Sequence, residues 1–195
     1  MKIILKAFPV ILFALLAIFT SCERQEKKKV SAETIDSLRT VYQAINDSLQ
    51  TAWDRMIEDD DQKLAYMRRL VQEVSYTNNF DSAEYNAMMD MIDQLASIRY
   101  DQKTMESSQL IDKYDSATYE TIRRVTAYAQ EHPQFENYPL MQELVNDIQQ
   151  AQEQVFFYRI RYDTLAKSYN AFIEDNEEFL VEIDNTRTDF KQKPL

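Results

Sequence analysis

The sequence contains no glycine, and among its 195 residues it has one cysteine, one histidine and four prolines. Phosphate-binding loops, dinucleotide-binding turns and nucleophile elbows use glycine because they need positive φ angles or a very close backbone approach. Tight two-residue hairpins use it for the same reason. A chain without glycine that is rich in Glu, Gln, Met, Leu, Ala and Lys is typical of an all-α protein.

The scarcity of histidine and cysteine also excludes much site chemistry. With His132 as the only histidine, the sequence has no HExxH motif and no Cys/His cluster, so zinc and di-iron sites lack ligands. It also lacks a credible Ser-His or Cys-His catalytic pair. Carboxylate pairs at residues 174–175 and 177–178 are an alternative acid–base site, but the pattern favours a solvated helix end. We therefore expect no enzymatic activity, no metal, no cofactor and no small-molecule substrate.

Acidic residues outnumber basic ones, 33 to 22, which gives a net charge of −11. Loss of residues 1–21, which carry Lys2 and Lys6 and no acid, changes the net charge from −11 to −13. Such a surface repels nucleic acid and anionic lipid headgroups, so neither is expected as a general ligand.

The first 22 residues have the three parts of a secretory leader. Lys2 and Lys6 form a positive start, residues 7–19 are an apolar run of 13 residues, and Thr20-Ser21 precede Cys22. The run is too short to span a bilayer comfortably. Small residues directly before a cysteine resemble the lipobox of bacterial lipoproteins. That resemblance implies that residues 1–21 are removed and that Cys22 carries acyl chains such as palmitate. The alternative is an uncleaved anchor with an incidental cysteine.

The polar segment at residues 22–30 follows, and we expect it to be a flexible tether. Its three lysines at 27–29 could touch lipid headgroups, although a solvated linker is favoured. No acidic run follows Cys22, and such a run resembles a surface-export signal in some lipoproteins. We therefore expect a location in the cell envelope, on the outer membrane and facing the periplasm. A helical domain at residues 31–185 and a frayed tail at 186–195 complete the predicted organisation.

Apolar residues recur at spacings of three and four over two long stretches, which predicts amphipathic helices. The first helix is expected from Ser31 to residues 78–79, with Asp59–Asp61 on a solvated face in preference to a cation site. A second helix is expected after a capping box at residues 81–84. A third is expected from Asp115 or Ser116 to Pro133, with inward positions at Tyr119, Ile122, Val125 and Ala129. Inward positions on the first two helices are Ile35, Leu38, Tyr42, Ile45, Leu49, Ala52, Met56, Leu64, Met67, Val71 and Val74, then Tyr85, Met88, Ile92, Leu95 and Ile98.

The fourth helix is expected to begin at Pro139, because proline suits the first helical turn. Phe156, Phe157 and Ile160 lie off its apolar stripe. We interpret them as core residues of a central helix, with a partner-binding face as the alternative. A short last helix is expected around residues 179–183. Together these elements predict an elongated, antiparallel up-down bundle of four main helices. The stripe of the fourth helix is Leu144, Ile148, Ala151, Val155, Tyr158, Tyr162, Leu165, Tyr169 and Phe172.

Two groups of motifs resemble the LemA family of anchored envelope proteins. The first is Ala52-Trp53 followed by residues 70–74 (LVQEV). The second is residues 131–133 (EHP) followed by residues 159–163 (RIRYD) and Tyr169-Asn170, although Asp163 stands where the family has asparagine. The resemblance extends over residues 40–180. It implies an N-terminal membrane anchor and an antiparallel helical bundle, but little about mechanism.

Two functional hypotheses follow from these patterns. The first is a lipid-anchored envelope protein that acts without catalysis as a scaffold or interaction module for a protein partner. The second is a client-binding or chaperone-like protein of the periplasm. If the first helix leads away from the membrane, its end and the loop before the fourth helix meet at a distal tip. Aromatic residues in these turns are candidate partner contacts, and plugging the end of the bundle is the alternative: Tyr76, Phe80, His132, Phe135 and Tyr138.

The lipid anchor is tested by Cys22→Ser. We expect this variant to lose acylation, because no other thiol is present, and to be released from or mislocalised at the membrane. Metabolic labelling with a fatty acid and fractionation of membranes measure both effects. Unchanged labelling of the variant would show that Cys22 is not the lipidated residue.

Overall fold

The computed structural model describes residues 31–78 and 80–186. The predicted leader, Cys22, the tether, Asn79 and the tail from residue 187 lie outside the described residues. The described part of the chain consists of helices and connecting turns, with no strand. The predicted all-α class is therefore confirmed, while the elongated four-helix up-down bundle is a finer statement and stays a prediction.

The described residues fall into two units that divide between Thr34 and Ile35, and the arrangement below is that of the second. In the first unit, the Ser31 hydroxyl accepts a hydrogen bond from the Thr34 amide at 3.2 Å, as expected of a helix cap. The helices, in chain order, are α2 (Ala32–Ser75), α3 (Ser82–Ser97), α4 (Ser108–Gln130), η1 (Phe135–Asn137), α5 (Pro139–Asp175), η2 (Glu177–Phe179) and α6 (Leu180–Ile183).

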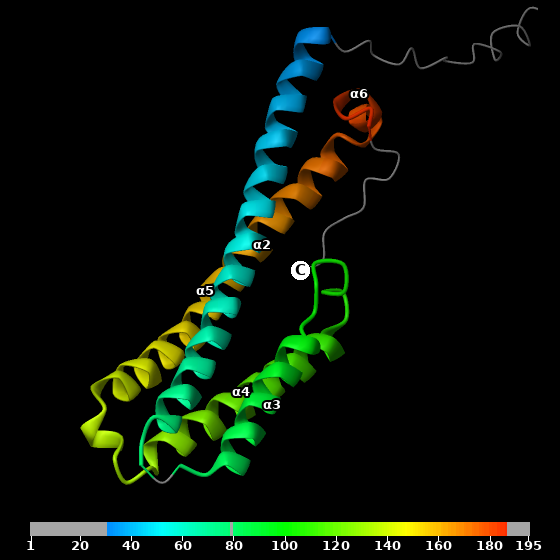
Figure 1. The fold of residues 1–195 in the computed structure, drawn as a ribbon. Coiled ribbons are helices and arrows are strands. Elements are labelled where there is room, and N and C mark those ends of the chain that lie inside the picture. Colours follow the sequence, from blue (N-terminus) through cyan, green and yellow to red (C-terminus); the bar gives the residue numbers. More distant parts are fainter. Residues whose placement is uncertain (1–30, 79, 187–195) are drawn as a thin grey trace, which may run out of the picture. The chain divides into compact units, whose positions relative to one another are not determined.

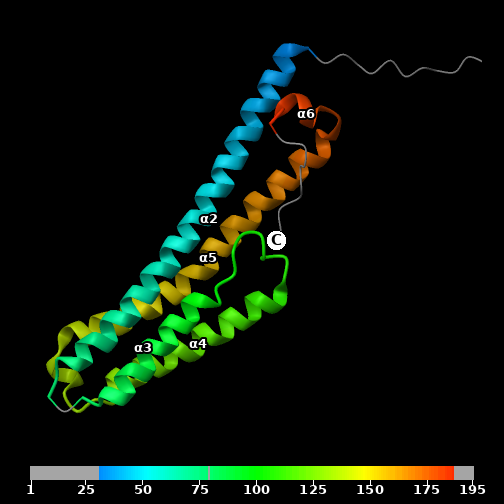
Figure 2. The ribbon, with the colours of Figure 1, turned by 45° about the vertical axis from the view of Figure 1, so that its right-hand side comes forward.

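Helices α2 and α5 pack against each other in opposite directions (Figures 1 and 2). The ring centroids of Tyr42 and Tyr169 are 6.1 Å apart, and those of Trp53 and Tyr162 are 5.8 Å apart. Residue numbers therefore fall along α5 as they rise along α2. Helices α3 and α4 lie side by side and form a shorter antiparallel hairpin, joined by the loop at residues 98–107 (Figures 1 and 2).

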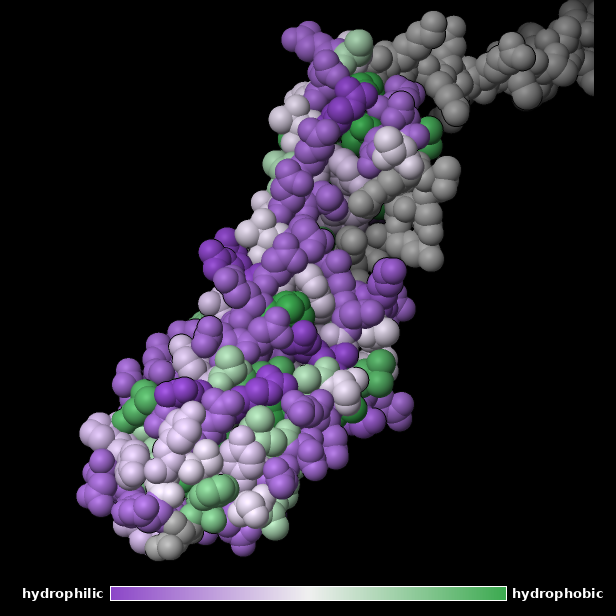
Figure 3. Space-filling view, in the orientation of Figure 1, coloured by the Kyte–Doolittle hydropathy of each residue, from purple (hydrophilic) through white to green (hydrophobic). Residues whose placement is uncertain are grey.

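The predicted stripes of α2, α3 and α5 form the core. Most of their positions are buried, and Leu38, Ile45, Tyr85, Ile98, Tyr158 and Leu165 are partly buried against the same cluster. Tyr162 and Tyr169, one heptad apart, are 0% and 1% exposed, so the predicted seam along α5 is confirmed. Outside the core, most of the visible face is hydrophilic (Figure 3).

Carboxylate side chains close the start of α3 and the turn before α4, without any glycine. The Asp81 carboxylate accepts hydrogen bonds from the amides of Ala83 at 2.7 Å and Glu84 at 3.2 Å, so the predicted cap is confirmed. In the loop before α4, the Asp101 carboxylate accepts from the amides of Lys103 at 2.9 Å and Thr104 at 2.8 Å. Such Asx turns hold the backbone where other chains often use glycine.

The ends of α2 and α4 differ from the prediction. Helix α2 ends at Ser75, before residues 78–79. Helix α4 begins at Ser108 and not at residues 115–116, and Tyr119, expected inside, is 68% exposed. Tyr119 is exposed because threonines occupy part of the face of α4 that points into the core. The hydroxyls of Thr118 and Thr121 are satisfied by carbonyls four residues earlier, so these polar residues can be buried.

Charge introduced into the α2–α5 seam is expected to be costly. Tyr162→Asp and Tyr169→Asp should each lower the free energy of unfolding by about 3 kcal/mol or more, because each buries an unpaired carboxylate and loses ring packing. Tyr76→Asp is the matched control, since Tyr76 is 63% exposed. Urea unfolding measures all three, and equal stability of the seam variants and the control would contradict the assigned register.

Candidate functional site

A cluster of charged side chains lies inside the helical unit, and its centre is a pair on α2. The side chains of Asp60 and Lys63 belong to residues that are only 5% and 1% exposed. The Lys63 ammonium lies 3.0 Å from one carboxylate oxygen of Asp60, one helical turn away. It also donates to the amide oxygen of Gln152 on α5 at 3.3 Å. A charge pair so deep in a core is unusual, because removing both charges from water is costly.

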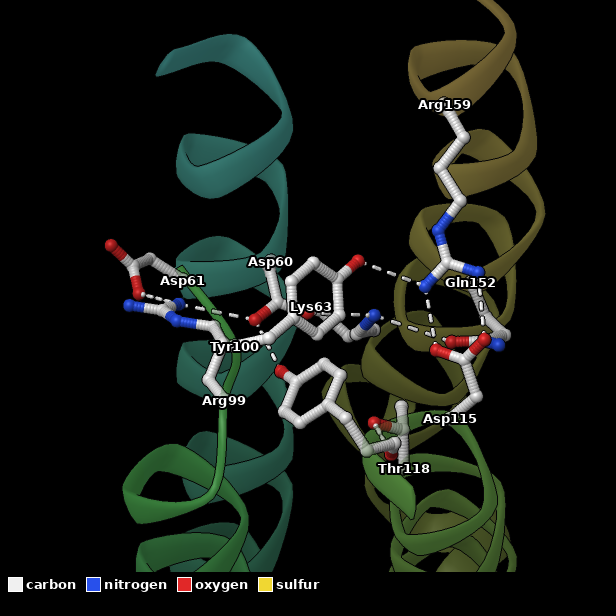
Figure 4. Close-up of polar contacts among 10 residues, drawn as sticks. Asp60, Asp61, Lys63, Arg99, Tyr100, Asp115, Thr118, Gln152 and Arg159 are labelled. Carbon is white, nitrogen blue, oxygen red and sulfur yellow. Dashed lines mark hydrogen bonds and ion pairs between the residues drawn. The ribbon is translucent and has the colours of Figure 1, made fainter. Parts of the chain in front are cut away.

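Two further elements contribute to Asp60 (Figure 4). Arg99, in the loop after α3, donates to Asp60 at 3.1 Å and to Asp61 at 2.6 Å. The hydroxyl of Tyr114 on α4 also donates to Asp60. The carboxylate of Asp60 thus connects α2 with the loop and with α4.

A second ion pair joins α4 to α5 beside the first. The guanidinium of Arg159 donates to both carboxylate oxygens of Asp115, at 2.7 and 2.6 Å. This bidentate geometry is the strongest for an arginine–carboxylate pair. It also donates to the hydroxyl of Tyr100 at 3.1 Å. Three acidic residues (60, 61 and 115) therefore face three basic ones (63, 99 and 159), so the cluster is neutral as a whole.

The pKa of Asp60 reflects a balance of opposing effects. Burial is the largest of them and opposes ionisation. Lys63, Tyr114 and Arg99 together outweigh it, so the pKa of the Asp60 carboxyl lies below its usual value. Asp60 is therefore ionised at neutral pH despite its burial.

The pKa values of Arg99, Tyr114 and Arg159 are raised, and so lie further from pH 7 than usual. Hydrogen bonds to Asp115 raise the pKa of Arg159 above its ordinary value. Burial lowers the pKa of Arg99, but Asp61 and Asp60 outweigh burial and raise it overall. Burial, with the negative charge of Asp60, raises the pKa of Tyr114. None of these groups is placed to exchange protons near pH 7, as general acid–base catalysis requires.

The cluster borders a cavity of about 100 Å³, which is also lined by Met56, Ile57, Thr118 and Val155. One water molecule needs only about 10–15 Å³ of such space, so the cavity has room for water. It is too small for a peptide or a cofactor of ordinary size.

Burial of Asp60 corrects the expectation of a solvated face at Asp59–Asp61. Only Asp61 is exposed, and it pairs with Arg99. A signal was present in the sequence, because Asp60 stands four residues after Met56 and four before Leu64, where the apolar stripe continues. An inward acid with a lysine three residues later is the pattern of a buried pair.

The segment after α2 and the loop before α5 meet, as the predicted tip requires. The Thr77 hydroxyl donates to the Val74 carbonyl at 2.6 Å and accepts from Nε2 of His132 at 3.0 Å. Nδ1 of His132 accepts from the Gln134 amide at 3.2 Å. The Asn78 amide donates to the Gln134 side chain at 3.1 Å. Nε2 of His132 and the side chain of Gln134 therefore join the two segments, while Nδ1 of His132 holds the loop before α5 itself.

The five predicted contact residues differ in exposure. Tyr76 is 63% and Phe80 is 39% exposed, and the ring of Phe80 packs edge-on against Tyr85 at 6.2 Å. Phe135 and Tyr138 are partly buried against the core, which favours the plugging role for these two. Whether any of the five binds a partner stays a prediction.

Sequence reasoning placed Phe156, Phe157 and Ile160 in the core, and this was wrong. They are 63%, 68% and 48% exposed on α5. Helix α5 contacts α2 through its apolar stripe and α4 through Arg159. The three exposed residues lie on neither of these sides. The alternative, a surface for a partner, is left open by this result.

Among residues 31–78 and 80–186, no helix is both long and apolar enough to cross a membrane. Comparison with protein-family models, curated proteins and solved structures finds no match. The resemblance to the LemA family and to bacterial lipoproteins therefore stays a prediction.

Acid titration tests the charged cluster. Because the pKa of Asp60 is lower in the folded than in the unfolded chain, its ionisation stabilises the fold fully above about pH 4, and this contribution is lost as the pH falls through the folded-state pKa. We expect Asp60→Asn to reduce the free energy of unfolding by about 3 kcal/mol at pH 7, because buried Lys63 loses its charged partner. The variant should also lose less stability than the wild type as the pH falls below about 4.

Urea unfolding between pH 7 and pH 2.5 measures both effects. Asp47→Asn, an exposed position on the same helix, is the control and should keep the wild-type slope. An Asp60→Asn profile parallel to that of the wild type would contradict the lowered pKa.

Proposed function

We propose that this chain is a lipid-anchored protein of the cell envelope that acts without catalysis as a scaffold or interaction module. The observation that carries this proposal is the end of the unit where hydrogen bonds join the segment after α2 to the loop before α5. Thr77, His132 and Gln134 hold them together, and Tyr76 and Phe80 remain exposed beside this connection. Exposed aromatic side chains on a rigid support are typical of protein interaction hot spots, since little ordering entropy is lost on binding.

The charged cluster supports a structural role instead of a catalytic one. Its cations and carboxylates are bonded to one another, and the pKa values of Asp60, Arg99, Tyr114 and Arg159 move away from neutrality. A catalytic acid or base needs a pKa near the working pH. A neutral, mutually bonded network inside a bundle instead holds the helices in one register.

The anchor and the location are the part of the proposal that rests on the sequence. Lysines, an apolar run and a small-residue pair before Cys22 support lipidation, and the acidic domain supports a position held away from anionic headgroups. We place the protein on the outer membrane, facing the periplasm, with a protein partner in the envelope.

The client-binding alternative has one observation in its favour, the exposed apolar residues at positions 156, 157 and 160. The cavity beside the charged cluster, at about 100 Å³, is too small for a polypeptide segment, so a client would have to bind on the outer surface. A client-binding protein should suppress the aggregation of an unfolded test protein when the two are mixed in equimolar amounts. We expect that this chain does not suppress it.

The tip is tested by partner capture from native envelopes after crosslinking. We expect Tyr76→Ala and Phe80→Ala to reduce recovery of a specific partner by about tenfold in combination, because each removes an exposed ring without opening the core. Val181→Ala, at a position 69% exposed on α6, is the matched control. Each protein is first shown to be folded by circular dichroism. Undiminished capture by the double variant would rule out the tip as the binding surface.

A further inference from the structure

Three large apolar side chains point into solvent within five residues of α5. Phe156 and Phe157 are 63% and 68% exposed, and Ile160 is 48% exposed. The two rings pack edge to face, with centroids 5.8 Å apart. We call these three residues the α5 patch. Large apolar side chains that gather on one part of an exposed helix surface are candidates for contact with another molecule.

The patch has a rigid support. Arg159 lies between Phe157 and Ile160 in the sequence, and its guanidinium is fixed by two hydrogen bonds to Asp115 on α4. The backbone under the patch is therefore held by an ion pair directed into the unit while the apolar side chains face outward. A surface held in this way loses little conformational entropy when it binds.

Two exposed charges flank the patch symmetrically. Glu153 stands four residues before Phe157, and Arg161 stands four residues after it. At a rise of 1.5 Å per residue, each charge lies about 6 Å along the helix axis from Phe157, in opposite directions. The helix face is thus negative on one side of Phe157 and positive on the other.

We propose that the α5 patch is a docking surface for a second copy of this chain, with the two α5 helices antiparallel about a two-fold axis at Phe157. In this arrangement, Glu153 of each copy is level with Arg161 of the other, so two pairs of opposite charge enclose the apolar centre. A parallel arrangement would put Glu153 beside Glu153 and Arg161 beside Arg161. Charge complementarity therefore selects both the occupant and its direction. This inference does not depend on the proposed function of the tip.

The size of the surface sets the strength of the association. Residues 153–161 cover about 12 Å of helix, so the buried area is well below the roughly 800 Å² per partner of a stable interface. The net charge of −11 also opposes contact between copies. We therefore expect a weak, reversible dimer, whose dissociation constant can be measured by sedimentation equilibrium.

The test is sedimentation equilibrium of the full chain in density-matched detergent, comparing the wild type with Glu153→Arg, Arg161→Glu and the double reversal. We expect each single reversal to weaken dimerisation by about tenfold, because like charges then face each other in both pairs. The double reversal should restore wild-type association, since an antiparallel pair regains opposite charges. In a parallel pair, like charges would face each other in the wild type and in all three variants, so neither single reversal would weaken association.

Net charge provides an internal control. Glu153→Arg makes the chain less negative and Arg161→Glu makes it more negative, so a general charge effect would move the two variants in opposite directions. Glu143→Arg, exposed on the same helix and level with an alanine of the second copy, should leave dimerisation unchanged. Phe157→Ser should abolish dimerisation while circular dichroism shows the helical content of the wild type.

Three results would overturn the proposal. They are a wild-type chain that stays monomeric throughout the accessible concentration range, single reversals that shift association in opposite directions, and a double reversal that restores nothing. Loss of a different protein from envelope crosslinks in Phe157→Ser, with the wild type monomeric, would assign the patch to that protein instead.

Discussion

The buried carboxylate of Asp60 constrains how the helices of this unit pack. An unpaired charge at this depth would cost several kcal/mol, so the fold must bring cations and donors to it. Lys63 comes from the same helix, Arg99 from the loop after α3 and Tyr114 from α4, while Lys63 also reaches Gln152 on α5. Any slip of one helix along another would leave part of this network unbonded. The cluster therefore favours one register over the many that an apolar seam alone would tolerate.

This interior explains how the exterior is organised. The Arg159–Asp115 pair joins one side of α5 to α4, and Phe156, Phe157 and Ile160 lie exposed on another side of that helix. At the end of the unit, His132 is engaged in joining two segments, so the aromatic rings beside it are left for contact with other molecules. Polar bonds inside the molecule thus decide which apolar side chains remain on its surface.

Sequence periodicity was sufficient where burial follows from apolarity. Leu144, Ile148 and Tyr162 lie in the core as their spacing predicts. It failed where a polar side chain is buried because other groups of the fold satisfy its hydrogen bonds. Asp60 is buried because of Arg99 and Tyr114, and Thr118 because its own backbone satisfies its hydroxyl. It failed again on α5, since a hydrophobic side chain does not reveal whether a neighbouring helix is present to cover it. The charged cluster could not be predicted either, because its members come from four elements whose proximity the sequence does not reveal.

The turns closed by Asp81 and Asp101 bear on the unfolded chain as much as on the folded one. Each glycine in a protein widens the range of backbone conformations that must be given up on folding, and this sequence has none. Carboxylate side chains restrain the same turns without adding that freedom. The denatured ensemble is therefore narrower than that of an ordinary chain of equal length, and less conformational entropy is lost when the helices form. Part of the stability of this protein thus lies in states that contain none of its native contacts.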